Sequence, residues 1–208
     1  MGERTYCFDD TLNKESVGYV VNIECSQGFH DAVAEIRNAF HKEFGDAVYL
    51  PGQGAMHITV YDFMTTLESY DRDVDEYYRS MSEELDSAIS HSIESIQPFT
   101  LSFNVLELFQ PCIIAKAKYS SELAIIRNKF LDVMELFPQT KRPPNIVHST
   151  IIAFREKVPF EQVHDLFSGY TLSWEESVQS LRLMRETKIR GQAQELVCEY
   201  TLASKKNS

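Results

Sequence analysis

Two four-residue segments of the chain place the same chemically useful side chains at the same spacing. Residues 57–60 read H-I-T-V and residues 148–151 read H-S-T-I, so each segment begins with a histidine and has a threonine two positions later. The segments start 91 residues apart, and each follows a stretch that contains proline. Both are predicted to lie in β-strands, because they are apolar and β-branched around the polar positions.

Strand geometry would bring the imidazole and the hydroxyl of each segment together. Side chains alternate across a strand, so His57 and Thr59 share one face, and His148 and Thr150 share one face of the second strand. If the two strands face each other across a cleft, two imidazoles and two hydroxyls surround one small volume.

This set of groups suits phosphodiester chemistry without a metal ion. At neutral pH one histidine can accept a proton from the nucleophile while the other protonates the leaving oxygen. Threonine hydroxyls can donate to the non-bridging phosphoryl oxygens. The nearest carboxylate, Asp62, is expected on the strand face opposite His57, so neither a metal site nor a cofactor is predicted.

A single motif of this kind is typical of a histidine in a protein core, and that alternative applies to each segment taken alone. Two matches at equivalent places favour a catalytic pair, His57 and His148. The remaining histidines are predicted to be structural or exposed: His30, His41, His91 and His164.

The elements around the motifs repeat in order along the chain. The first half is predicted to contain strands at 17–23, 48–50, 56–63, 99–109 and 111–118, and helices at 29–44 and 71–93. The second half is predicted to contain helices at 120–137 and 159–168, and strands at 146–154, 177–189 and 194–203. This order predicts an α+β fold of two similar lobes, each a mainly antiparallel sheet backed by helices. Residues 1–16 are predicted to be a polar lead-in, and residues 17–208 one domain.

The net charge of the chain and its distribution limit the classes of ligand that the protein is expected to bind. The net charge of −11 argues against a protein that binds long nucleic acid non-specifically, which would need a basic surface. Residues 1–104 carry 6 Lys and Arg against 19 Asp and Glu, whereas residues 105–208 carry 14 against 12. The acidic half therefore favours a short substrate with few phosphates.

Cysteine spacing and hydropathy indicate the cellular setting. The four cysteines form no C-x-x-C pair, so a zinc ribbon or a redox motif is not expected: Cys7, Cys25, Cys112 and Cys198. No segment is apolar enough for a signal peptide or a membrane span. We expect reduced thiols, a cytoplasmic location and no membrane partner.

The paired motifs in a duplicated α+β chain of this size resemble the 2H phosphoesterase superfamily. That group includes RNA 2′,3′-cyclic phosphodiesterases, 2′,5′-oligoadenylate phosphodiesterases and viral enzymes that degrade signalling nucleotides. The resemblance extends over about residues 17–203 and implies two lobes that face across a central cleft lined by His57, Thr59, His148 and Thr150. Ser149 departs from the pattern, which prefers an apolar residue there, and predicts a partly wet back face for its strand.

Within that fold, further residues are candidates for substrate contact. Alternation places Tyr61 and Phe63 on the His57 face, and Ile152 and Phe154 on the His148 face. Such aromatic side chains could stack on a nucleobase, although for Phe63 and Phe154 a place in the core is favoured. Additional candidates are Tyr19 and Tyr49. Six basic residues could meet phosphate, with Arg185 preferred among them: Arg142, Arg155, Arg182, Arg185, Lys188 and Arg190.

The sequence therefore predicts a monomeric, metal-independent phosphodiesterase acting on a small nucleotide or short oligonucleotide. The bond could be a 2′,3′-cyclic phosphate, a 2′–5′ linkage or a cyclic-dinucleotide linkage. One alternative is a module that binds or sequesters nucleotides in the same cleft without turnover. Another is a protein-interaction domain that uses the acidic helix at 71–93, for which a solvated helix face is the ordinary explanation.

Overall fold

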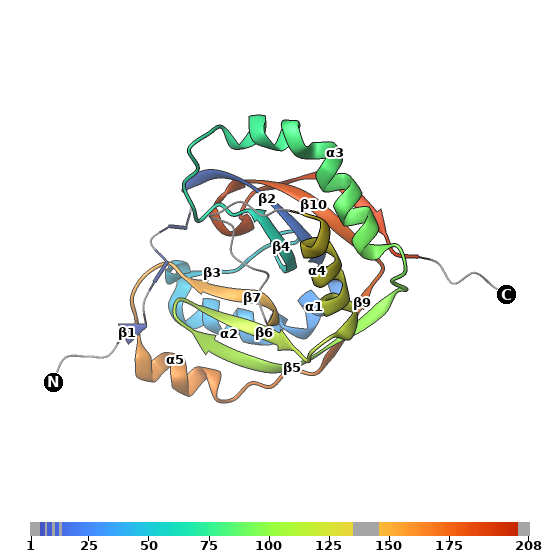
Figure 1. The fold of residues 1–208 in the computed structure, drawn as a ribbon. Helices are drawn as coiled ribbons and strands as arrows, with labels where there is room; N and C mark the ends of the chain where they lie inside the picture. The colour runs from blue at the N-terminus through green and yellow to red at the C-terminus, as the bar shows by residue number, and fades with distance from the viewer. Residues whose placement is uncertain (1–4, 7, 10, 13, 135–145, 204–208) are drawn as a thin grey trace.

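The computed structural model describes residues 5–6, 8–9, 11–12, 14–134 and 146–203. Its strands form two main sheets and one short pair, with helices on the outside, which confirms the predicted α+β class and the two antiparallel sheets (Figure 1). No helix of the described residues is long and apolar enough to cross a membrane.

The first sheet has four antiparallel strands in the order β11-β10-β2-β4. They are β2 (Glu15–Glu24), β4 (His57–Met64), β10 (Ser180–Lys188) and β11 (Gln194–Thr201). Helix α3 (Val74–Ile93) covers its outer side and packs on α4 (Ser121–Val133) (Figure 1). The inner part of β2 is buried without a break and is apolar except for Asn22, because it is a central strand covered on both faces.

The second sheet has five antiparallel strands in the order β3-β7-β6-β5-β9. They are β3 (Val48–Tyr49), β5 (Phe99–Phe109), β6 (Cys112–Ala117), β7 (Val147–Phe154) and β9 (Trp174–Val178). This lobe also contains α1 (Gln27–Ala32), α2 (Ala34–Phe44), the short turn η1 (Gly45–Ala47) and α5 (Phe160–Phe167). A separate pair joins β1 (Thr5–Tyr6) to β8 (Val158–Pro159).

The two lobes do not coincide with the two halves of the sequence. The first sheet combines β2 and β4 with β10 and β11 from the end of the chain, and the second takes β3 from the first half. The predicted strand at 177–189 is in fact two strands, β9 and β10, which end and begin on either side of Gln179 and belong to different sheets. The acidic and nearly neutral halves of the sequence are therefore mixed within each lobe.

The helices agree with their predicted positions except near their ends. The predicted helix at 29–44 is divided at Val33, which leaves helical geometry and separates α1 from α2. Helix α3 begins only at Val74, because the Asp73 side chain accepts a hydrogen bond from the Glu76 amide and caps the helix. The part of the predicted helix at 120–137 that follows Met134 lies outside the described residues.

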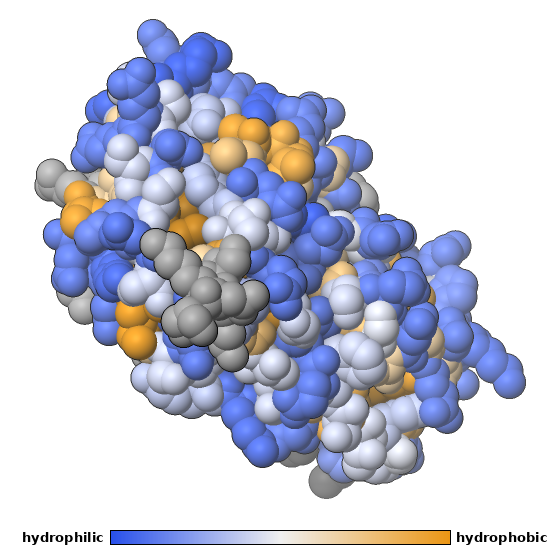
Figure 2. Space-filling view, turned by 90° about the vertical axis from the view of Figure 1, so that its right-hand side faces the viewer, coloured by the Kyte–Doolittle hydropathy of each residue, from blue (hydrophilic) through white to orange (hydrophobic). Residues whose placement is uncertain are grey.

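The surface seen in Figure 2 is mainly hydrophilic, with separate hydrophobic patches rather than one broad apolar face. Buried apolar side chains of both sheets and of the helices that cover them join into one core cluster. This shared core fixes the position of one sheet against the other, and so holds β4 and β7 next to each other.

Candidate active site

The four side chains of the two motifs line one cavity. Its volume is about 410 Å³, and His57, Thr59, His148 and Thr150 all contribute to its wall. The first two come from β4 and the last two from β7, so each sheet supplies one imidazole and one hydroxyl. The two segments, which start 91 residues apart in the sequence, therefore face one space.

Strand alternation explains how each motif presents its side chains. In β4, His57 and Thr59 are partly exposed while Ile58 and Val60 are fully buried, and β7 repeats this pattern. Neither threonine hydroxyl forms a hydrogen bond with the described residues. Both hydroxyls are therefore available to a ligand.

Beyond the threonines, both strands depart from simple alternation. In the pairing of β2 with β4, Asn22 lies opposite Thr59 and Val21 opposite Tyr61, so Val60 is an extra residue. Such a bulge moves the side chains that follow it to the other face, as far as the next irregularity, which in β4 comes after Asp62. Asp62 consequently lines the cavity, and the prediction that it lies on the face opposite His57 is wrong.

The same irregularity occurs at the equivalent position of β7. There Ile114 lies opposite Thr150 and Ile113 opposite Ile152, so Ile151 is the extra residue. As a result Ala153, five positions after the histidine, lines the cavity just as Asp62 does in β4. The prediction that Ile152 and Phe154 share the His148 face is wrong for the same reason.

The aromatic residues moved by the bulges lie in the core. Tyr61 stacks on Phe130 with ring centroids 4.0 Å apart and donates a hydrogen bond to the Ile126 carbonyl. Phe154 is fully buried and packs against Phe40, and Phe63 is also fully buried. Neither Tyr61 nor Phe154 is among the described residues that line the cavity.

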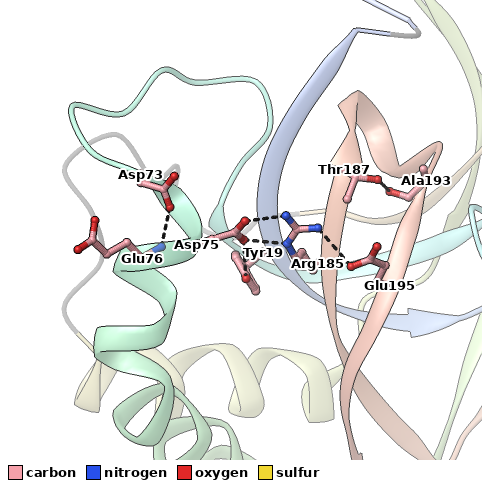
Figure 3. Close-up of polar contacts among 8 residues, drawn as sticks. All are labelled: Tyr19, Asp73, Asp75, Glu76, Arg185, Thr187, Ala193 and Glu195. Carbon is pink, nitrogen blue, oxygen red and sulfur yellow. Dashed lines mark hydrogen bonds and ion pairs between the residues drawn. The ribbon is translucent and has the colours of Figure 1, made fainter.

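Arg185 and Tyr19 are committed to a polar cluster that ties α3 to the first sheet (Figure 3). Arg185 donates to both carboxylate oxygens of Asp75, at 2.8 and 2.6 Å, and to Glu195 at 3.2 Å. Tyr19 donates to Asp75 at 2.8 Å and stacks on Tyr78. The described cavity wall includes neither Arg185 nor Tyr19.

Tyr49 is the predicted aromatic contact that the structure does bring to the cavity. It lies on β3, beside β7, and is partly exposed. The guanidinium of Arg155 lies 5.1 Å from the centre of its ring. Of the other basic candidates, Arg142 and the side chain of Arg190 lie outside the described residues.

The surroundings of His57 fix its orientation and favour its neutral form. Its Nδ1 lies 2.9 Å from the Ala55 carbonyl, which leaves Nε2 for a ligand. Gly191, with φ of +65°, packs so closely that a Cβ there would lie 3.1 Å from Cε1 of the imidazole. Burial lowers the pKa of His57 to about 4, and the charges of Arg182 and His148 act in the same direction.

His148 has fewer partners. Its Nδ1 is buried and has no hydrogen-bond partner among the described residues. Burial lowers the pKa of His148, followed by the positive charges of Arg127 and Lys116. Both imidazoles are therefore biased toward the neutral state.

A buried carboxyl completes the wall beside His57 and was not found from the sequence. Glu186 of β10 accepts hydrogen bonds from Thr66 at 3.3 Å and from Gln194 at 3.1 Å. Burial raises the pKa of Glu186 to about 7, and the Asp62 carboxylate adds to the shift. Since Glu186 lies on a strand far from both motifs in sequence, no local pattern could identify it.

Ser149 is not on a wet face. Its side chain is fully buried and accepts a contact of 3.6 Å from the Cys25 thiol at the end of β2. The prediction of a partly wet back face is therefore wrong: the polar atom of Ser149 is satisfied by the neighbouring lobe.

The described lead-in residues also reach the cavity. Asp9 and Leu12 line it, and the Asp9 amide donates to the Phe154 carbonyl at 2.9 Å. Within the described ranges, no group of three or more His, Cys, Asp or Glu side chains is arranged to hold a metal ion.

Comparison with known proteins places these observations in a wider group. The model of the 2′-5′ RNA ligase superfamily matches residues 26–190. No curated protein matches the chain. TT0787 of Thermus thermophilus is similar in structure, with 14% identity and a TM-score of 0.58 over 90% of this chain and 99% of that one.

Two further solved structures have the same fold. LigT of E. coli, complexed with 3′-AMP, has 13% identity and a TM-score of 0.59 over 91% of this chain and 99% of that one. The PDE domain of MHV ns2 has 14% identity and a TM-score of 0.53 over 81% of this chain and 99% of that one. At such low identities the likeness establishes the fold.

Proposed function

The chain belongs to the 2′-5′ RNA ligase superfamily, and on that premise we propose that it is a metal-independent phosphodiesterase that hydrolyses a small nucleotide by two-histidine acid–base catalysis. The resemblance to 2H phosphoesterases is confirmed by the family match and the fold, which support a phosphoesterase type of function. The observation that carries the finer proposal is the single cavity lined by both histidines and both threonines.

The hydrogen bonding and electrostatics of the histidines suggest their roles. The Ala55 carbonyl accepts from Nδ1–H of His57, so Nε2 of the neutral ring has a lone pair for the nucleophile. We assign His57 as the general base on this ground, and His148 as the general acid. The negative charge of a phosphate bound between the rings would raise the pKa of His148 and so stabilise the protonated ring that a general acid needs.

The threonines would bind the phosphoryl group. Their hydroxyls have no partner among the described residues and line the cavity from β4 and from β7. Each can donate to a non-bridging oxygen, where negative charge develops in the transition state. This arrangement requires no Lewis acid for charge stabilisation.

The rest of the wall favours a small nucleotide. Tyr49 offers an aromatic face, whereas the Asp62 carboxylate lies where additional phosphates would be repelled. LigT, which has the same fold, has been crystallised with 3′-AMP and with ATP. The bond cleaved is a 2′,3′-cyclic phosphate, a 2′–5′ linkage or a cyclic-dinucleotide linkage. In this proposal residues 17–208 act as one monomeric, cytoplasmic domain.

The experiment that tests this function is hydrolysis of a panel of these three nucleotide classes with and without EDTA. Wild type is expected to cleave at least one class in EDTA, and His57→Ala and His148→Ala to lose roughly 10²- to 10⁴-fold in rate. His91→Ala, on the exposed side of α3, is the matched control and should retain full rate. Full activity in either cavity variant would overturn the assignment.

A nucleotide-sequestering module is the second candidate, favoured by the lowered pKa of both histidines, which disfavours the protonated form that a general acid needs. Calorimetry with the same panel distinguishes the two. Tight binding with no turnover over hours would establish sequestration, and turnover would exclude it.

A further inference from the structure

Arg127 lies at the place where the two motif strands meet. It projects from α4 toward β4 and is 9% exposed. Its Nε donates to the Val60 carbonyl at 3.1 Å, and its Nη2 donates to the Thr59 carbonyl at 2.7 Å. These are the backbone groups of the bulge in β4.

The two hydrogen bonds from Arg127 are possible because β4 is distorted at the bulge. In a regular strand, successive carbonyls point toward opposite edges, so one guanidinium would not reach both. β4 is the outer strand of its sheet, paired with β2 alone, and the extra residue Val60 turns two successive carbonyls toward Arg127. The rigid fork of an arginine can bind both at once, which the single ammonium group of lysine does not do equally well.

We propose, on the basis of the function proposed above, that Arg127 is a positioning residue that holds the bulge of β4 and thereby sets the orientation of Thr59 and Asp62 in the cavity. The bulge moves Asp62 to the cavity side while Thr59 remains there. Without these bonds, the segment has two buried carbonyls and an extra residue that regular pairing with β2 would expel, and regular pairing would turn Asp62 away.

Arg127 also acts on the second motif through its charge. After burial, the positive charge of Arg127 does most to lower the pKa of His148, and Lys116 adds to it. Lys116 lies opposite His148 in the pairing of β6 with β7 and is held by Glu107 at 3.3 Å. Arg127 thus binds the backbone of the first motif and lowers the pKa of His148 in the second.

Two substitutions separate these effects. Arg127→Lys retains the charge but loses the fork, and Arg127→Met loses both. Lys129→Met, on the same helix with an exposed side chain that contacts Ser95, is the matched control. For each protein we would measure kcat and KM on the best nucleotide, amide hydrogen exchange at Val60 and Tyr61, and the pKa of His148 by NMR titration.

The expected results differ between the variants. Arg127→Lys should lower kcat roughly ten- to hundredfold with KM little changed and faster exchange at the bulge, because Thr59 is displaced. The pKa of His148 should remain as in wild type. Arg127→Met should show the same losses and, in addition, a raised pKa of His148, whereas Lys129→Met should match wild type throughout.

Wild-type kcat and exchange in Arg127→Lys would overturn the proposal. An unchanged pKa of His148 in a folded Arg127→Met would overturn the effect of the Arg127 charge on the second motif. If Arg127→Met does not fold, Arg127→Lys decides alone through its exchange and kcat. If wild type turns over no nucleotide, the proposed function fails, while the exchange and titration still test the role of Arg127.

Discussion

At the scale of single residues, the cavity places two imidazoles where burial and nearby cations favour the neutral ring. Nothing in the sequence around His57 indicates Arg182 or Gly191 as its neighbours, because they come from β10 and from the turn η2 (Ile189–Gly191). The residue types and spacing of the motifs were sufficient to predict which four side chains face the cavity. Their protonation depends on partners distant in sequence, which only the fold supplies.

The pH dependence of catalysis follows from these neighbours. Acid–base catalysis needs one neutral and one protonated imidazole, and the pKa of both rings lies below 6.5 in the free protein. The singly protonated pair is therefore most populated above about pH 4, where His57 loses its proton, and below the lowered pKa of His148, so kcat/KM should rise as the pH falls from 8 toward 6. A profile from pH 4 to 9, with circular dichroism to verify folding, measures this. A maximum above pH 7.5 would contradict it.

The buried carboxyl of Glu186 predicts that stability also increases as the pH falls. A glutamate in the unfolded chain has a pKa of 4.5, whereas Glu186 retains its proton to about pH 7 when folded. Between these values the folded state binds more protons, so the free energy of unfolding contributed by Glu186 falls as the pH rises. Glu186→Gln should therefore be more stable than wild type at pH 8, by at most about 3 kcal/mol, and nearly equal to it at pH 4.5.

Urea denaturation of both proteins at pH 4.5 and 8 provides the measurement, with Glu84→Gln on the exposed face of α3 as the control. The control should show no such difference between the two pH values. Equal free energies of unfolding for wild type and Glu186→Gln at pH 8 would contradict the prediction, because ionisation of Glu186 would then not destabilise the folded state.

At the scale of elements, the strand face of each side chain in β4 and β7 could be predicted from the sequence only up to the bulges. Alternation held from His57 to Thr59 and from His148 to Thr150, and failed beyond Val60 and Ile151. The bulges have no marker in the sequence, since both extra residues are ordinary β-branched strand residues. Their partners, including Arg127 of α4, come from other elements, so tertiary contacts decide the register.

The cluster around Arg185 indicates that this residue attaches α3 to the first sheet and does not contact the substrate (Figure 3). Arg185 joins the first turn of α3 to β10 and β11 through Asp75 and Glu195, and the loop before α3 brings Thr65, Thr66 and Leu67 to the cavity wall. Arg185→Met should lower the free energy of unfolding by about 2 kcal/mol, because Asp75 loses a partly buried charged partner. KM should change less than about threefold.

Thermal or urea denaturation together with steady-state kinetics measures both quantities. Arg72→Met, which removes an exposed ion pair with Asp71, is the control and should leave both unchanged. Unchanged stability together with a large rise in KM would restore Arg185 to the role of a phosphate contact.

At the scale of the whole molecule, the chain builds each lobe from both halves of its sequence. The repeated order of elements correctly predicted two antiparallel sheets, but β10 and β11 return to the sheet that holds β2 and β4. The charge difference between the halves is therefore not a difference between the lobes. Acidic character enters the cavity instead through individual side chains such as Asp62 and Glu186, which alternation and local pattern did not place there.

The central claim is that His57 and His148 act as a pair in this cavity. A double-mutant cycle tests it: kcat/KM in EDTA for wild type, His57→Ala, His148→Ala and the variant with both changes. If the histidines act as one catalytic unit, each single change should lower kcat/KM at least about 10²-fold. The double variant should then have nearly the same kcat/KM as the slower single variant. Multiplicative losses, or a single variant with wild-type kcat/KM, would contradict the claim.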